Sequence, residues 1–401
     1  MENKGFFRKG FYGLALFAAA GSVWGEALVL EPSVSIRAFY DDNAALTIRE
    51  HNDSVGSELL GALKLSRKAD AMELKGVARL NMLLSASGDV YRDKDNQLIS
   101  MEFIRKGELS RWRVSGSWRR DSIVRSVRVT DQDDVTPEPD DDVDAGLVQV
   151  SVRRNRYIVK PSWSYNLSPR TEIAAGMGFD KVVFEDTGET LLFDYENNSL
   201  FGRHFYRITE RDRITTTLTM KQYRADAVNR DYDSGSLLVG LEHSYSETAT
   251  GHFQLGWYQT QWRHLGGKEG TDGGYLARIY VEKRTGLTKF SGRIGRSTFA
   301  SGAGYVVNSD ELVFNMVRDL TETMRFSLRI KAFQNESIQD DFPEANRRYI
   351  SITPALSWRV SQWLSVNASY RYRRQNRDID AQSAESNALY LSVRYARPTP
   401  L

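Results

Sequence analysis

The sequence lacks cysteine altogether, and this sets the first limits on what the protein can be. Without thiols there is no disulfide scaffold, no cysteine-ligated zinc site and no thiol nucleophile. Proline is scarce, at 9 of 401 residues, while tyrosine (19), phenylalanine (18) and tryptophan (8) are plentiful. A composition rich in aromatics and poor in proline favours β-strands over disorder.

Long hydrophobic runs are also missing, apart from one short run near the N-terminus. Basic residues precede an apolar segment at 11–20, and small residues then lead to Gly25. This pattern is typical of a signal peptide. No later segment approaches the ~18 consecutive apolar residues of a membrane-spanning helix. We therefore predict a signal peptide at 1–25 and a single exported domain at 26–401.

Alternation of apolar and polar residues is the main signal in the rest of the chain. It recurs in about eighteen segments between residues 33 and 396, among them 72–83 and 274–284, and most of them are ~10–14 residues long. Transmembrane β-strands need ~9–11 residues, whereas globular strands average ~5–6. Short connections such as SPR, TERD and SQW alternate with long ones such as SASGDVYRDKDN. Tight turns at one end and long loops at the other are typical of outer-membrane barrels.

These observations predict an all-β fold, a transmembrane antiparallel up-and-down β-barrel of about 18 strands, within a range of 16–20. An even number of strands returns the C-terminus to the periplasmic side. A β-propeller is the main alternative, because turns recur at a similar spacing, but a propeller blade packs four short strands into ~40–45 residues. Pro161 and Pro354 fall inside expected strands, where each should mark a bulge or a strand start, because proline cannot donate to the ladder.

The two faces of the expected strands differ in charge. In LSVNASYRYRR (364–374), apolar and aromatic residues share one parity, while serine, asparagine and arginine share the other. The stretch RWRVSGSWRR (111–120) alternates in the same way. In a membrane barrel the apolar face contacts lipid and the polar face lines the lumen. The expected solute path is lined by Arg111, Arg113, Arg119, Arg213, Lys221, Arg325, Arg329, Lys331, Arg371, Arg373 and Arg394.

Basic residues outnumber acids on this face. The expected lumen carboxylates are Glu58, Glu73, Glu102, Glu242 and Glu282. Rings of arginine and lysine favour an anion pathway, because they raise the local concentration of anions. Tyr258, Tyr280 and Tyr390 share the face and are candidates for stacking on sugar rings. The alternative is a structural barrel whose cations pair with lumen carboxylates and fill the bore.

Acidic residues concentrate instead in the segment 122–147, which includes the run TDQDDVTPEPDDDVD. We predict that this segment is an acidic extracellular loop. Its spacing matches no EF-hand, so screened surface carboxylates are favoured over a calcium site. Contact with lipopolysaccharide through bridging cations is expected as well, in addition to contact with outer-membrane lipid.

No catalytic motif accompanies these features. GxSxG, HExxH and a phosphate-binding loop are all missing from the sequence. His243 and Ser244 are adjacent, so their side chains would point to opposite faces of a strand. We therefore expect no enzyme, no cofactor and no metal site. Nucleic acid is not an expected partner either, because no basic cluster is interleaved with loop aromatics.

Several stretches resemble outer-membrane β-barrel porins of Gram-negative bacteria. They are the start of the mature chain, LEPSVSIRAFYDDNAALT, the strand–turn–strand unit PSWSYNLSPRTEIAAGMGF, and the turn–strand pieces ITERDRITTTLTM and LTETMRFSLRI. The resemblance covers nearly the whole mature chain, through loose motifs. It departs from the group at the C-terminus, which reads RYARPTPL instead of ending in an aromatic residue that the outer-membrane assembly machinery recognises. Either Tyr395 serves that role or recognition differs.

The resemblance implies a cell outer membrane location and a transport function. Some members of the group are associated with exopolysaccharide export and are thought to work with a periplasmic polysaccharide export protein. Passage of an anionic or neutral exopolysaccharide through the basic lumen is therefore the first hypothesis. The alternatives are a general anion-preferring diffusion porin, in which the acidic segment would fold into the bore, and a structural or surface-binding barrel with a filled lumen.

Overall fold

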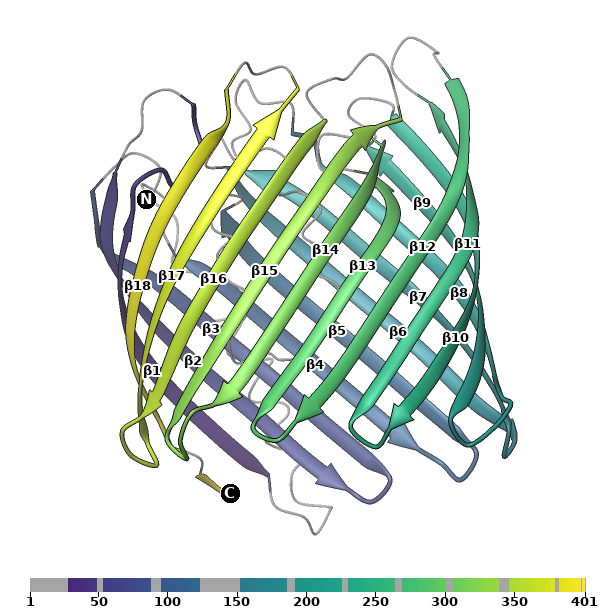
Figure 1. The fold of residues 1–401 in the computed structure, drawn as a ribbon, viewed down its shortest axis with the longest axis horizontal. Coiled ribbons are helices and arrows are strands. Elements are labelled where there is room, and N and C mark those ends of the chain that lie inside the picture. The colour runs from purple at the N-terminus through teal and green to yellow at the C-terminus, as the bar shows by residue number, and fades with distance from the viewer. Residues whose placement is uncertain are drawn as a thin grey trace, which may run out of the picture.

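Long antiparallel strands close into a single barrel in the computed structural model (Figure 1). The structure describes residues 28–48, 53–87, 95–122, 152–185, 192–225, 230–263, 269–300, 306–338, 346–378, 382–397 and 399–400. The strands are β1 (Val29–Asp41), β2 (Ser54–Ala69), β3 (Met72–Ala86), β4 (Asn96–Lys106), β5 (Ser110–Ser122), β6 (Arg153–Ser168), β7 (Thr171–Glu185), β8 (Tyr195–Arg207), β9 (Asp212–Ala225), β10 (Arg230–Ser246), β11 (Ala249–Arg263), β12 (Glu269–Thr285), β13 (Thr288–Ala300), β14 (Val306–Asp319), β15 (Met324–Ser337), β16 (Arg347–Arg359), β17 (Leu364–Arg377), β18 (Ala384–Ala396) and β19 (Thr399–Pro400).

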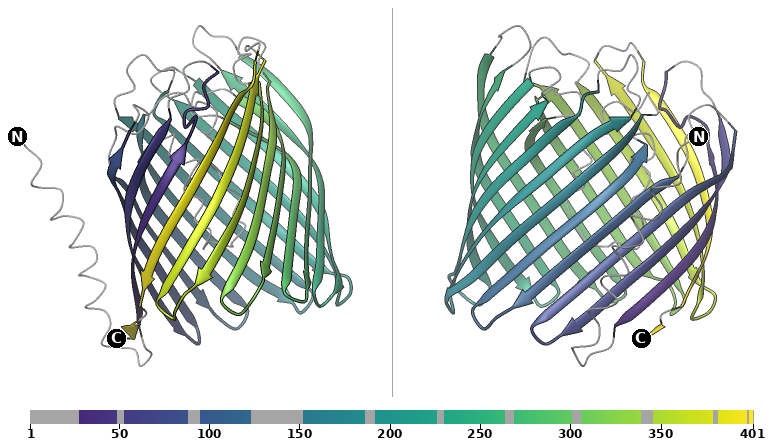
Figure 2. Two further views of the ribbon diagram at one scale, coloured as in Figure 1. Left: turned by 60° about the vertical axis from the view of Figure 1, so that its left-hand side comes forward. Right: turned by 180° about the vertical axis from the view of Figure 1, so that it is seen from behind.

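The wall closes because β1 pairs with β2 on one side and with β18 on the other, as Figure 2 shows where the purple and yellow strands meet. The two-residue β19 pairs with Val29 and Leu30 in the same register that β18 uses along the rest of β1. It therefore continues β18 and adds no wall position, which leaves 18 wall strands out of the 19. The expected fold class and strand number are confirmed. No helix among the described residues is long and apolar enough to cross a membrane.

Connections alternate in length, as the sequence predicted. The eight short turns all lie at one end of the barrel, here called the short-turn end, where β1 begins and β18 stops (Figure 1). The strand ends that the long connections join lie at the opposite end, here called the long-loop end. The predicted signal peptide and nearly all of the acidic segment 122–147 fall outside the described residues, although β5 ends and β6 begins at the long-loop end.

Hydroxyl side chains cap five of the short turns. Ser168 Oγ, for example, accepts hydrogen bonds from the backbone N–H groups of Arg170 (3.2 Å) and Thr171 (3.1 Å). Equivalent bonds are accepted in other turns by Thr209, Ser246, Thr321 and Ser361. Serine and threonine favour turns because they bond the backbone locally in this way. The caps fix where each strand pair begins and so help to set its register.

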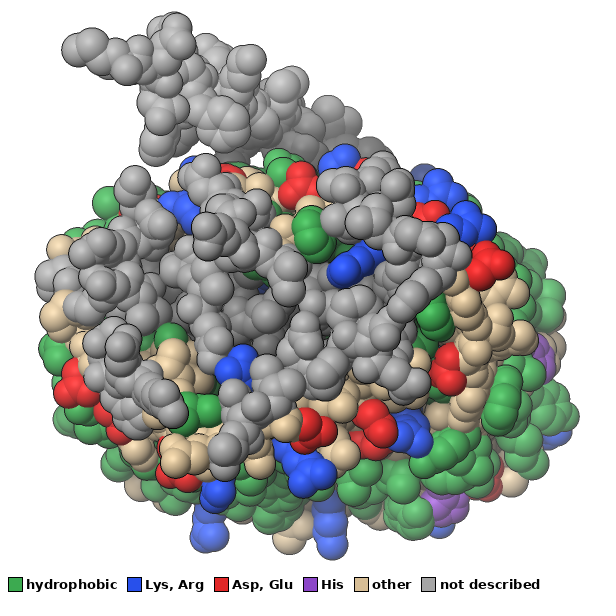
Figure 3. Space-filling model, turned by 90° about the horizontal axis from the view of Figure 1, so that it is seen from above, with side chains coloured by type: hydrophobic (Ala, Val, Ile, Leu, Met, Phe, Trp, Pro, Cys, Tyr) green, Lys and Arg blue, Asp and Glu red, His purple; other side chains and the backbone are tan. Residues whose placement is uncertain are grey.

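Large apolar side chains cover the outside of the wall. On β11, for example, the alternate residues Leu255 and Trp257 have exposed fractions of 50% and 59%. The outer wall in Figure 3 is accordingly hydrophobic, and charged side chains gather towards the rim. A closed barrel with this surface suits a bilayer, since every wall strand has two hydrogen-bonded neighbours and lipid meets a mainly apolar surface.

The two prolines behave differently from expectation. Pro161 pairs with Val114 on β5, but neither Lys160 nor Pro161 pairs with β7. Pro354 likewise pairs with β15 and interrupts only the ladder with β17. The register is the same on both sides of each interruption, so neither proline marks a bulge or a strand start. The expectation was wrong because a missing N–H removes bonds on one side of a strand only, and the flanking pairs hold the alignment.

Lipid-phase labelling checks which face is outside. A cysteine in place of Val114 or Tyr370 is expected to react with a thiol reagent dissolved in the bilayer, because both side chains are exposed on the apolar face. A cysteine at the neighbouring Ser115 or Ser369 is expected to be protected, because it faces the lumen. The native chain has no cysteine, so each variant carries a single thiol. Labelling of the serine positions instead would reverse the assignment of the faces.

Candidate functional site

The candidate site is the lumen face of the wall. On β18 the side chains of Leu389, Leu391 and Val393 are exposed by 44–56%, so Arg394 points to the other face. The same alternation places all the residues of the expected path on the lumen face. Arg111, Arg113 and Arg119 lie on β5, Arg213 and Lys221 on β9, Arg325, Arg329 and Lys331 on β15, Arg371 and Arg373 on β17, and Arg394 on β18. Their contact with a solute stays a prediction.

Five of these cations pair with a carboxylate on a neighbouring strand. Arg213 Nη2 lies 2.5 Å from Glu242 Oε2, directly opposite in the β9–β10 register. Arg113 Nε donates to Glu102 Oε2 at 2.7 Å across the β4–β5 pair. Further ion pairs join Arg325 to Asp319, Lys331 to Glu311, Arg394 to Glu31, Lys106 to Glu73, Arg37 to Glu58 and Lys289 to Glu282. Each of the expected lumen carboxylates is thus paired, and much of the wall is electrostatically balanced.

Arg371 and Arg373 do not line an open path. Their exposed fractions are 7% and 0%, and both donate to the buried carboxylate of Asp41 at 3.2–3.4 Å. Arg373 also donates to the backbone carbonyls of Asn43 and Ala44. The expectation placed these two arginines on the correct face, but a segment of the chain covers them. The apolar–polar alternation of a strand predicts on which face a side chain lies. It does not predict whether another segment of the chain covers that side chain.

The covering segment is 42–48, which follows β1 and turns back into the lumen; we call it the strap. Asn43 holds it in place, because its Nδ2 donates to the carbonyls of Thr47 (2.8 Å) and Glu385 (2.9 Å). Leu46 is 1% exposed and adopts a left-handed backbone with φ of 51°. A non-glycine residue rarely takes this conformation, so the surrounding contacts must impose it. The strap packs on the lumen face of β15–β18.

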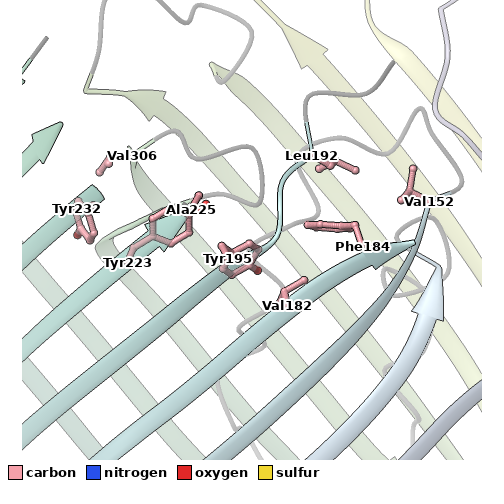
Figure 4. Close-up of a cluster of buried hydrophobic side chains, with 9 residues drawn as sticks. All are labelled: Val152, Val182, Phe184, Leu192, Tyr195, Tyr223, Ala225, Tyr232 and Val306. Carbon is pink, nitrogen blue, oxygen red and sulfur yellow. The ribbon is translucent and has the colours of Figure 1, made fainter. Parts of the chain in front are cut away.

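A hydrophobic cluster fills a second part of the lumen at the long-loop end (Figure 4). Its aromatic centre is Tyr195 stacked on Tyr223, with ring centroids 5.2 Å apart. The cluster consists of Val152, Val182, Phe184, Leu192, Tyr195, Tyr223, Ala225, Tyr232 and Val306. Its strand members come from β7–β10 and, through Val306, from β14, while Val152 immediately precedes β6 and Leu192 precedes β8. Strands that are not neighbours therefore meet across the lumen, which narrows it.

The wall of β8–β13 also forms a polar recess of about 180 Å³, which we call the basic recess. Its three cations are Arg203, Lys221 and Arg278. The remaining lining residues are Phe201, Thr217, Thr219, Ser234, Ser236, Leu238, Gln254, Tyr258, Leu276, Ser297 and Thr298. No carboxylate belongs to this lining in the described part of the chain. The recess therefore combines net positive charge with many hydroxyl donors, which suits an anion.

Aromatic rings position Arg203 in the basic recess. Its guanidinium lies 5.5 Å from the Phe201 ring centroid and 5.6 Å from that of Phe205, and its Nε donates to Thr217 Oγ1 at 3.2 Å. Contact with two ring faces holds a cation by cation–π attraction while leaving its remaining N–H groups available. Arg203 and Arg278 are both exposed to the lumen.

Two of the three recess cations were missed from the sequence. In SLFGRHFYR (199–207) both parities carry aromatic residues, so the face of Arg203 was ambiguous. In LARIYVE (276–282) the apolar parity is clear, and the alternation could have identified Arg278. Lys221 was predicted. The grouping of the three depends on strand register across five neighbouring strands, which alternation within one strand does not contain.

The tyrosines expected to stack on sugars are engaged in the wall. Tyr280 donates to Glu282 at 2.7 Å, and the Tyr390 hydroxyl accepts from Arg371 at 2.6 Å. Tyr258 is 3% exposed and lies close to Asp272. These contacts favour a packing role over sugar stacking, which needs an open ring face.

The histidine that precedes a serine in the sequence is paired with a carboxylate and does not face that serine. His243 Nδ1 lies 2.7 Å from Asp212 Oδ1, while the adjacent Ser244 lies on the opposite face. No group of three or more histidine, aspartate or glutamate side chains that could hold a metal ion occurs in the same described ranges.

Comparison with known proteins identifies the architecture. No family model matches the chain, and no curated protein sequence does. Solved structures do match: Acinetobacter baumannii OccAB4 shares 10% identity at a TM-score of 0.51, over 93% of this chain and 98% of that chain. A BenF-like porin from Pseudomonas fluorescens Pf-5 shares 8% identity at a TM-score of 0.51, over 93% of this chain and 99% of that one. The fold is therefore that of Gram-negative outer-membrane porins, and with its apolar outer wall it assigns the chain to the outer membrane.

Proposed function

We propose that the protein is a diffusion channel that prefers small anions, and that the basic recess is their binding point in the lumen. The observation that carries this proposal is the recess lining, which combines Arg203, Lys221 and Arg278 with no carboxylate among the described residues. On other parts of the wall, cations such as Arg113 and Arg213 pair with carboxylates across the strands. A local excess of positive charge in a low-dielectric wall concentrates anions and speeds their capture.

A filled structural barrel fits less well. It requires that lumen cations be matched by lumen carboxylates throughout. This holds for pairs such as Arg213–Glu242 and Arg293–Glu311, the latter at 2.8 Å. The lining of the basic recess itself contributes three cations and no carboxylate among the described residues. A surplus of fixed charge on one part of the wall is typical of a solute pathway.

Passage of an exopolysaccharide is also less well supported than diffusion of small solutes. A polymer needs a continuous wide bore, whereas the strap and the hydrophobic cluster both occupy lumen at the long-loop end. The solved structures that share the fold include a porin by name, which favours the diffusion channel. Neither of the two structures compared above is named for a polysaccharide or for an export protein.

Charge selectivity tests the proposal. In a planar bilayer under a KCl gradient, the wild-type channel is expected to show a reversal potential on the anion-selective side. Replacing Arg203, Lys221 and Arg278 with glutamine is expected to lower the chloride-to-potassium permeability ratio several-fold, because the attraction that concentrates anions is lost.

Arg348→Gln provides the matched control for the single variant Arg278→Gln. Arg348 is exposed on the outer face of β16, so its replacement removes one positive charge without changing the lumen. The control is expected to keep the wild-type reversal potential. A cation-selective wild-type channel, or equal shifts from Arg278→Gln and Arg348→Gln, would contradict the proposal.

A further inference from the structure

The barrel wall is incompletely paired between β12 and β13. Their ladder runs from Thr285↔Thr288 at the turn to Ala277↔Arg296. Above that point, within the described ranges, residues 269–276 of β12 pair only with β11, and residues 297–300 of β13 pair only with β14. Figure 1 shows β13 turning away from β12 in this upper part. We call this unpaired stretch the seam.

The basic recess extends to the seam. Leu276 and Arg278 line the recess from β12, and Ser297 and Thr298 line it from β13. Neighbours on a regular strand point to opposite faces, so two consecutive lining residues mean that the edge of β13 is rotated towards the recess. Thr298 is only 7% exposed although the alternation on β13 would place it outside. The recess is therefore separated from the outer surface at this point by side chains and not by a hydrogen-bonded ladder.

One hydrogen-bonded group of side chains fills the seam. The Tyr258 hydroxyl lies 2.7 Å from Asp272 Oδ2 and 2.9 Å from Asn308 Oδ1. Thr298 Oγ1 donates to the same Asn308 oxygen at 2.6 Å. These residues come from β11, β12, β13 and β14, so the group bridges the two separated edges. We call it the Tyr258 plug.

A glycine makes the Tyr258 plug possible. Tyr258 belongs to β11 and is paired with Gly274 on β12, so its side chain must cross β12 to reach Asn308 on β14. A Cβ atom at Gly274 would lie 2.9 Å from Tyr258 Cε1 and 3.1 Å from its hydroxyl oxygen. Any larger residue would displace the ring. Glycine also weakens a strand, and β12 carries Gly270, Gly273 and Gly274 in its unpaired part.

The surroundings of the seam define what it would admit. On the outer face Tyr275 is 57% exposed, and the Arg296 guanidinium lies 4.7 Å from its ring centroid. Exposed aromatic residues of this kind lie at the membrane–water boundary in barrels. On the inner side the recess presents cations beside the apolar groups of Leu238 and Leu276. An anion that carries an apolar group fits both surroundings: its apolar group suits the aromatic outer face and the recess leucines, and its charge suits the recess cations.

We propose that the seam is a side portal, closed by the Tyr258 plug, through which amphiphilic anions pass between the membrane surface and the basic recess. The portal lies beside the hydrophobic cluster, since Asn308 of the plug and Val306 of the cluster both belong to β14. It therefore provides a second route to a lumen that the cluster and the strap narrow from the long-loop end. The inference rests on the proposed function only in taking the basic recess as part of the solute path.

Locking the seam tests the portal as a route. Leu276 and Ser297 would form the next pair if the β12–β13 register continued, and the chain has no other cysteine, so Leu276→Cys/Ser297→Cys can form one unique disulfide. In a planar bilayer, formation of the disulfide is expected to reduce the pentanesulfonate current several-fold more than the chloride current, each measured relative to the reduced form of the same variant, so that the effect of the two substitutions themselves cancels. Reduction should restore the pentanesulfonate current. Unchanged pentanesulfonate current, or an equal loss of both currents, would overturn the portal.

Thiol accessibility tests the plug independently of transport and of disulfide formation. A single cysteine at Leu276 is expected to react several-fold faster with a charged, membrane-impermeant thiol reagent when Tyr258→Phe removes the hydrogen bonds of the plug. A cysteine at Ser291, where the β13 ladder is complete on both sides, is the control and should react at the same rate in both backgrounds. Equal rates at Leu276 would refute the plug. If the wild-type channel shows no anion selectivity in the reversal-potential measurement, that result would refute only the proposed function and would leave the plug untouched.

Discussion

Replacing Asp41 with alanine is expected to lower the free energy of unfolding of the barrel by about 3–5 kcal/mol, because it leaves buried positive charge without its partner. Asp41 is 0% exposed and accepts hydrogen bonds from Arg371, Arg373 and Ser386. Two guanidinium groups thus share one carboxylate. Without it, neither cation can reach water in the folded barrel. Urea-induced unfolding of the refolded protein in lipid vesicles, followed by tryptophan fluorescence, measures the change.

Glu31→Ala is the matched control for this variant. Glu31 lies on the same strand and also pairs with an arginine of the C-terminal region, Arg394, at 3.4 Å. That pair is partly exposed, at 32% for Glu31 and 21% for Arg394, so its loss is expected to cost below about 1 kcal/mol. Equal destabilisation by the two variants would show that burial at Asp41 does not matter. The Asp41 variant should also loosen the strap, which single-channel recording would register as a larger or noisier open current.

Replacing Gly256 with valine is expected to prevent formation of the native barrel. A Cβ atom at Gly256 would overlap the carbonyl oxygen of Leu237 and lie 2.8 Å from Leu238 Cα. Both contacts are with the backbone of the neighbouring strand β10, so no side-chain rotation can relieve them. The strands would have to separate at a point where β10 and β11 are fully paired, which we expect to cost more than about 3 kcal/mol. The heat-modifiable band of a folded barrel on SDS gels is the readout.

Gly235→Val controls for the effect of adding a β-branched residue. Gly235 lies on β10 within the same part of the wall, and a Cβ atom there would meet nothing within 4 Å. This variant is expected to fold and to migrate like the wild type, since valine has a high preference for strands. If Gly256→Val gives the same folded band as Gly235→Val, the two strands approach less closely than the structure indicates.

Much of the architecture follows from alternation and turn chemistry. The segment expected to begin at residue 72 forms β3 from Met72, and every short connection predicted from the sequence is a turn at one end of the barrel. Leu389 and Leu391 are exposed, as their parity predicted. These features were predictable because strand periodicity and turn residues act over a few neighbours.

The candidate site was harder to predict because its parts are distant in sequence. Arg373 is buried by the strap, which lies about 330 residues earlier in the chain. The sequence around Arg373 contains no signal that predicts this burial. The basic recess depends on the alignment of β8–β13, which side-chain parity alone leaves open. The seam could not be predicted from the sequence for a different reason. The glycine-containing stretch EGTDGG (269–274) resembles a loop, and the segment was expected to begin as a strand only at residue 274, whereas β12 begins at Glu269.

The junction of β1 and β18 has a consequence for the order in which the protein is assembled. Asp42 and Asn387, which bond each other through backbone and side-chain groups, are separated by 345 positions. The ribosome delivers the first of these residues long before the second. Until the last strand arrives, β1 keeps an unpaired edge that could join to another chain. Closure is thus the step of highest sequence separation and the one expected to be slowest. A chaperone that shields β1 through that interval would protect the whole molecule from aggregation.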